Sequence, residues 1–115
     1  MKKGPNASEL LAQLAKTHAD VEEGIACAGT ALESRTFKVN KKAFLFLTAT
    51  QARLKLEASL EEAAELATHD ARYQVGGLGW LKIQLDEGRP PPRALLGRWI
   101  KESHALMSGA RARRR

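Results

Sequence analysis

Residues 35–56, RTFKVNKKAFLFLTATQARLKL, decide the fold of this chain. Apolar and polar residues alternate over 36–39, which is typical of a β-strand with one buried face. After a polar turn at 40–42, the apolar run 43–47 predicts a central strand. A second polar turn leads to 52–56, where the alternation resumes. The stretch therefore predicts a three-stranded antiparallel meander.

Helical patterns flank the meander on both sides. Apolar residues at helical spacing predict a first helix over about residues 6–18. The second helix is expected to begin at Ser59, which has the spacing of a capping box with Glu62. Its apolar positions face one side and its glutamates the other.

A third helix is expected after the prolines at 90–92, with Gly109 as its stop. Trp99 falls within its apolar stripe, so we expect this ring to pack in the core. Arg98 and Glu102 have the spacing of an ordinary helical ion pair.

Two further stretches contribute to the predicted sheet. Alternation over 80–85 predicts a fourth strand, and 72–75 can form a short extended piece. The stretch 19–34 has weak periodicity and predicts a loop with one short strand. The resulting order predicts an α+β fold of two layers: a largely antiparallel sheet of about four to five strands, with the helices packed on one face.

The charge distribution separates the ends of the chain from its body. The 115 residues carry a net charge of +6, yet residues 4–110 hold equal numbers of acidic and basic side chains. The excess belongs to Lys2, Lys3, Arg111, Arg113, Arg114 and Arg115. Such terminal runs are commonly solvated. We therefore predict a flexible basic N-terminus over 1–5, one domain over 6–109 and a flexible basic tail over 110–115.

The location of the protein is predicted from segments that the sequence lacks. No apolar run approaches the roughly 20 residues of a membrane helix, and the start MKKGPNA leads into no signal-type apolar block. The single cysteine, Cys27, has no partner for an internal disulfide, which suits a reducing compartment. We expect a cytoplasmic protein that does not bind membranes, and a buried Cys27.

Residue types that carry catalysis or bind metals occur without the spacing that such sites need. His18, His69 and His104 lie far apart, and none belongs to a metal-binding helix motif. The glycine-rich turn at 76–79 lacks the lysine and the serine or threonine of a P-loop. We therefore expect no catalytic residue, no metal site and no cofactor, and we do not expect an enzyme.

The body of the chain separates its charges by segment. Six basic residues and no acidic ones lie between Arg35 and Lys55, whereas 57–70 holds five acidic residues and neither lysine nor arginine. If the apolar positions of the strands face the helices, alternation sends a basic and aromatic set to the opposite sheet face. That set is Lys38, Arg53, Lys55, Trp80 and Lys82.

Such a face can be interpreted in two ways. Lysine and arginine can neutralise phosphates while Trp80 stacks on a base. Equally, the charges can keep an open sheet face soluble and guard its edges, with Trp80 as a partly buried lid. The candidate nucleic-acid-binding residues are Lys38, Lys41, Lys42, Arg53, Lys55, Trp80, Lys82, Arg113, Arg114 and Arg115.

An ordered set of short motifs runs through about residues 21–107. The motifs are Val21-Glu22-Glu23-Gly24, Gly29, Thr36-Phe37-Lys38-Val39, the lysine pair before Ala43-Phe44, Leu54-Lys55-Leu56, Gly79-Trp80-Leu81-Lys82-Ile83 and Glu102-Ser103. This set resembles the MmcQ/YjbR family. The resemblance implies an α+β fold likened to a double-winged DNA-binding architecture. The basic tail at 111–115 is not part of it.

Together, the charge pattern and the resemblance predict a non-catalytic nucleic-acid-binding domain, with DNA as the expected ligand. It would use the basic sheet face, assisted by the basic tail. The alternative is a protein-interaction module with no nucleic-acid or enzymatic role, which docks an acidic partner or associates with its own copies.

Overall fold

The computed structural model describes residues 7–18, 20–30, 33–48, 50–85 and 91–108 of the chain. These residues form six strands and three α-helices. The strands are β1 (Val21–Ala26), β2 (Ser34–Val39), β3 (Lys42–Leu47), β4 (Gln51–Lys55), β5 (Tyr73–Val75) and β6 (Trp80–Gln84). The helices are α1 (Ala7–Lys16), α2 (Leu60–His69) and α3 (Arg93–Ser108), with a 3-10 turn at Gly77–Gly79.

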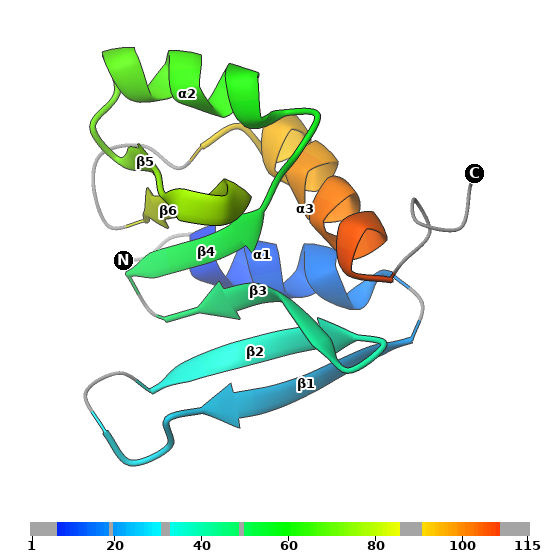
Figure 1. Ribbon diagram of the computed structural model, residues 1–115. Helices are drawn as coiled ribbons and strands as arrows, with labels where there is room; N and C mark the ends of the chain where they lie inside the picture. The colour runs from blue at the N-terminus through cyan, green and yellow to red at the C-terminus, as the bar shows by residue number, and fades with distance from the viewer. Residues whose placement is uncertain (1–6, 19, 31–32, 49, 86–90, 109–115) are drawn as a thin grey trace.

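The strands form one antiparallel sheet in the order β1-β2-β3-β4-β6-β5 (Figure 1). The predicted α+β class is confirmed, and the sheet has one strand more than the upper expectation. The edges are formed by β1, from the stretch of weak periodicity, and by the three-residue β5. None of the helices in the described residues is long and apolar enough to span a membrane.

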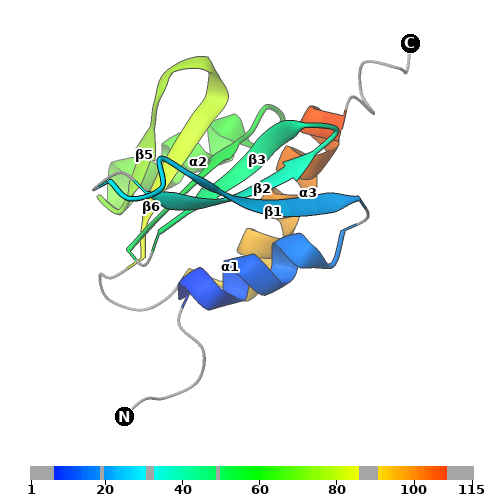
Figure 2. The ribbon, with the colours of Figure 1, turned by 90° about the horizontal axis from the view of Figure 1, so that it is seen from below.

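Two rows of apolar side chains cross the sheet on the face that the helices cover. They are Phe37, Leu45, Leu54 and Leu81 in one row, and Leu47, Ala52, Ile83 and Tyr73 in the other. Figure 2 shows α1 lying against one side of the sheet, and Leu11 of α1 and Leu96 of α3 are completely buried. Full burial of such a side chain stabilises the fold by about 1.5–3 kcal/mol.

The strands β3 and β4 are paired over only three residue pairs, and α3 bridges them where the pairing ends. The register runs from Leu47↔Ala52 to Leu45↔Leu54. Beyond it, the backbone N–H of Lys55 donates to Ser103 Oγ at 3.0 Å. The Ser103 hydroxyl in turn donates to the Phe44 carbonyl oxygen at 2.6 Å. A buried serine of α3 therefore replaces a hydrogen bond between the strands.

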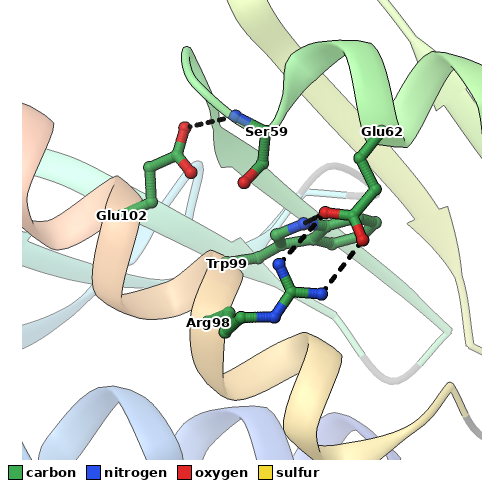
Figure 3. A network of polar contacts seen from close by, with 5 residues as sticks. All are labelled: Ser59, Glu62, Arg98, Trp99 and Glu102. Atoms are coloured by element: carbon green, nitrogen blue, oxygen red, sulfur yellow. Dashed lines mark hydrogen bonds and ion pairs between the residues drawn. The ribbon is translucent and has the colours of Figure 1, made fainter.

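A network of charged side chains joins α3 to α2 (Figure 3). The Glu102 carboxylate accepts the backbone N–H groups of Glu57 at 2.6 Å and Ser59 at 3.0 Å. Glu62 binds both terminal nitrogens of Arg98, at 3.1 and 3.0 Å, and accepts the Trp99 indole N–H at 3.4 Å.

Two sequence-based expectations about this network are wrong. Ser59 makes no side-chain capping bond, so the capping box with Glu62 does not form. Arg98 is hydrogen-bonded to Glu62 on another helix instead of to Glu102 four residues along. In both cases a partner brought close by the tertiary fold replaces the partner that is near in sequence.

The pKa values of the two glutamates reflect these bonds. The hydrogen bonds from Arg98 lower the pKa of the Glu62 carboxyl below its ordinary value. Burial alone would raise the pKa of Glu102, but the hydrogen bonds from Ser59 and the Glu57 backbone lower it overall. Both carboxylates are therefore stabilised in the charged form that the network needs.

Cys27 is exposed, in the turn that follows β1. The expectation of a buried cysteine is therefore wrong. Its φ of +55° places it in the left-handed region that turns use. The sequence around it is short of large apolar residues, so the chain there has no reason to enter the core.

Gly79 closes the hairpin between β5 and β6 because no larger residue fits. Its φ is +84°, and an added Cβ would lie 2.7 Å from the Leu56 carbonyl oxygen. The close approach lets the Gly79 carbonyl accept the N–H of Leu56 at 2.9 Å. This contact extends the pairing of β4 with β6 past Lys55.

Two histidines that lie far apart in sequence stack on each other at the ends of α1 and α3. The ring centroids of His18 and His104 are 4.9 Å apart, and Phe44 meets the His104 ring edge-on at 5.2 Å. Burial lowers the pKa of His18 from its ordinary value of 6.5, and the charges of His104 and Lys101 lower it further. The fold therefore disfavours the protonated form of His18.

Removal of the Ser103 hydroxyl should destabilise the fold. In Ser103→Ala, the Lys55 N–H and the Phe44 carbonyl lose their shared partner, at a cost of about 1–3 kcal/mol in the free energy of unfolding. The control is Thr68→Ala, which removes an exposed hydroxyl bond within α2 and should change the free energy by less than about 0.5 kcal/mol. Equal effects of the two substitutions in denaturant titrations would contradict the bridging role.

The free energy of unfolding should fall as the pH drops from 6.5 to about 5, above the range in which carboxylates protonate. In that window the unfolded chain binds a proton at His18 more readily than the folded one, so acid favours unfolding. His18→Gln should flatten the profile measured by denaturant titration. The exposed His69, changed to Gln, serves as the control, and a profile unaltered by His18→Gln would refute the assignment.

Candidate nucleic-acid interface

The sheet face opposite the helices carries polar and aromatic side chains in register. One row crosses five strands, from Thr36 through Phe46, Arg53 and Lys82 to Gln74. In the neighbouring row, Lys55 of β4 lies directly opposite Trp80 of β6. The structure thus places Arg53, Lys55, Trp80 and Lys82 on one face, as the alternation predicted. We call Phe46, Arg53, Lys55, Trp80 and Lys82 the basic-aromatic face.

Cations and rings alternate on the basic-aromatic face. The Arg53 guanidinium carbon lies 5.0 Å from the centre of the Phe46 ring. The Phe46 ring meets Trp80 edge-on, with the centroids 5.7 Å apart. The Lys55 Nζ lies 5.9 Å from the centre of the Trp80 ring. Attraction between a cation and a π face holds both charges close to the rings without neutralising them.

An open groove of about 930 Å³ runs across this face. At one end it is lined by Phe46, Gln51, Arg53, Gln74, Trp80 and Lys82. At the other end it reaches Cys27 and Glu33. Glu33 accepts the backbone N–H of Gly29 at 3.0 Å, so this end of the groove carries a carboxylate.

The cations of the basic-aromatic face lie apart from the described carboxylates. Among the described residues, no carboxylate lies within ion-pair distance of Arg53, Lys55 or Lys82. The strands β3, β4, β5 and β6, which are described over their whole length, contain no aspartate or glutamate. Three arginines elsewhere are paired with carboxylates: Arg35 with Glu23, Arg72 with Asp70 and Arg98 with Glu62.

Three predicted site residues lie apart from this cluster. Lys38 of β2 lies directly opposite Glu22 of the edge strand β1, on the side of the sheet away from β4 and β6. Lys41 and Lys42 are exposed at the turn between β2 and β3, where Lys41 has a φ of +67°. The predicted residues Arg113, Arg114 and Arg115 lie outside the described residues.

Phe46 is the residue of this face that sequence reasoning missed. It lies within the apolar run 43–47, where every position looks like core and no alternation marks the exposed side. The alternation in the next strand, β4, could have revealed the side on which Phe46 lies, because Phe46 pairs with Arg53 across the turn. Counting back from Arg53 in a hairpin register would have placed the ring on the open face.

Metal binding has no support in the part of the chain that the structure describes. No group of three or more histidine, cysteine, aspartate or glutamate side chains there could hold a metal ion. The stacked His18 and His104 belong to the helix side, away from the groove. The chemistry offered by the groove over β3, β4, β6 and β5 is therefore that of cations, amides and aromatic rings.

Comparisons with known proteins add no identification to this geometry. No protein-family model, no curated protein and no solved structure matches the chain. The resemblance to the MmcQ/YjbR family therefore stays an expectation from short motifs.

Proposed function

We propose that this chain is a non-catalytic nucleic-acid-binding domain, with DNA as the expected ligand, and that the basic-aromatic face contacts the nucleic acid. Its support is the grouping of three cations without carboxylate partners, Arg53, Lys55 and Lys82, beside two partly exposed rings. When the cations of such a face neutralise phosphates, the nucleic acid releases its condensed counterions, and this release supplies a large share of the binding affinity.

The grouping of unpaired cations around aromatic rings favours a polyanion over a solvated surface. Lysine and arginine that only keep a sheet soluble have no need to cluster around aromatic rings in a groove. Here Arg53 and Lys55 each lie over a ring, and Lys82 follows in register with Arg53. The MmcQ/YjbR resemblance adds DNA binding as the expected function, which is an argument by analogy.

The alternative function is a protein-interaction module. A protein partner for this face would have to be acidic, because the face offers cations and no carboxylate on β3 to β6. An acidic peptide and a nucleic acid differ in one respect that can be measured: only the nucleic acid has both a dense line of charges and bases.

Replacement of single cations should lower the salt dependence of binding. With labelled duplex and single-stranded DNA in a salt series, Arg53→Ala or Lys82→Ala should each reduce the slope of log K against log salt by about one. Each should weaken binding to all sequences alike. The measurement is fluorescence anisotropy at several salt concentrations.

Lys16→Ala is the matched control, because it removes one positive charge from the helix side, where Lys16 lies 3.9 Å from Glu23. It should leave the slope unchanged. Deletion of residues 110–115 separates the tail from the face: the truncated chain should bind more weakly but keep the effects of Arg53→Ala and Lys82→Ala. If the two face variants bind like the parent while the tail deletion abolishes binding, the proposed face is wrong, and a polyanionic peptide becomes the next ligand to test.

A further inference from the structure

Large aromatic rings on an uncovered sheet face are unusual enough to need a role. A large aromatic ring is usually buried in the core, as Trp99 is here. Phe46 and Trp80 remain partly exposed, edge to face at 5.7 Å, on the two strands that flank β4. A partly exposed pair of rings that lines a groove is the ordinary starting point for a binding-site hypothesis.

We propose that this groove binds single-stranded nucleic acid, whose unpaired bases stack on Phe46 and Trp80. The phosphates beside those bases would pair with Arg53, Lys55 and Lys82. The inference rests on the proposed nucleic-acid function and adds to it the strand form that the face recognises.

Because the rings lie in a groove, they favour single-stranded nucleic acid over a duplex. In a duplex the bases stack on one another and show only their edges, which are read by an element that protrudes into a groove of the DNA. The rings here line a groove of the protein and lie on β3 and β6. They can reach the face of a base only when that base has left its own stack.

Arg53 and Lys55 lie close to the positions that the phosphates of stacked nucleotides would occupy. Arg53 and Lys55 lie over the two rings, 5.0 and 5.9 Å from the ring centres. A base can stack on the Arg53 guanidinium, because this group is planar, and it can stack on the Trp80 ring beside the Lys55 ammonium. A ring and its neighbouring cation can therefore bind the base and the phosphate of the same nucleotide. Arg53 with Phe46 would bind one nucleotide, and Lys55 with Trp80 would bind the next.

The groove also indicates where the strand lies. Glu33 at the far end repels phosphates, so the nucleic acid is expected over β3, β4, β6 and β5. Three strand spacings of about 4.8 Å span about 14 Å, which suits a short site of ~4 nucleotides. Gln51 and Gln74 line this half, and their amides can both donate to and accept from base edges.

The test compares labelled single-stranded DNA, single-stranded RNA and duplex DNA of equal length, about 12 nucleotides. We expect the single strands to bind more tightly than the duplex. Phe46→Ala and Trp80→Ala should each lower single-strand affinity roughly 5- to 150-fold, with the salt slope unchanged. The DNA and RNA arms show which sugar is preferred, and tighter binding of either single strand supports the proposal.

Further variants separate stacking from folding. Trp80→Phe should keep most of the affinity, whereas Trp80→Leu, which retains apolar bulk but has no π face, should lose it. Ile25→Ala is the control, because Ile25 is an exposed apolar residue on the edge strand, 53% accessible and outside the groove. Thermal unfolding of every variant confirms that affinity is compared between folded proteins.

Tryptophan fluorescence provides a direct measure of stacking. The chain has two tryptophans, and Trp99 is completely buried, so quenching by a stacked base reports on Trp80. Addition of a single strand should quench the emission of the parent and leave that of Trp80→Phe unchanged.

Two results overturn the inference. If the duplex binds at least as tightly and the ring variants bind like the parent, while Arg53→Ala still lowers the salt slope, stacking is wrong and the proposed function stands. If neither the ring variants nor the cation variants alter binding, both proposals fail.

Discussion

The separation of β3 from β4 depends on one hydroxyl group that takes the place of a strand-to-strand hydrogen bond. Ser103 of α3 accepts the Lys55 N–H and donates to the Phe44 carbonyl, so β3 and β4 can separate without leaving buried backbone groups unpaired. Figure 1 shows β3 and β4 diverging on the side where α3 lies. The separation leaves Phe44 buried against His104, whereas Phe46, two residues on, stays paired with Arg53. The open face therefore begins next to the point where Ser103 replaces the pairing of the two strands.

The charges of the molecule follow the same division into two sides. On the helix side, arginines meet carboxylates: Arg98 binds Glu62 and Arg35 binds Glu23 at 2.8 Å. On the open side, Arg53 lies over an aromatic ring, with no carboxylate within reach among the described residues. The net charge of the chain comes from the two ends of its sequence, yet the folded body can still present a positive face. The paired side stabilises the fold, and the unpaired side stays available to a polyanion.

Local patterning predicted much of this arrangement, and tertiary contacts account for the rest. The alternation in β4 and β6 gave the side of the sheet on which Arg53 and Lys82 lie, because a period of two leaves only one choice once the core is known. The apolar run in β3 hid Phe46, since it has no alternation to read. The partners of Glu62 lie more than thirty residues away along the chain, so a capping box was the nearest interpretation and was wrong. No rule of spacing could have brought His18 to His104.

The most direct measurement of the central claim is an NMR titration of the labelled protein with a short single-stranded DNA. Binding through the basic-aromatic face predicts shifts of the Trp80 indole signal and of backbone amides along β3, β4 and β6. The Trp99 indole, which is buried and bonded to Glu62, should stay in place. Shifts confined to α2 and α3 or to the basic tail, with the Trp80 indole unmoved, would contradict the account.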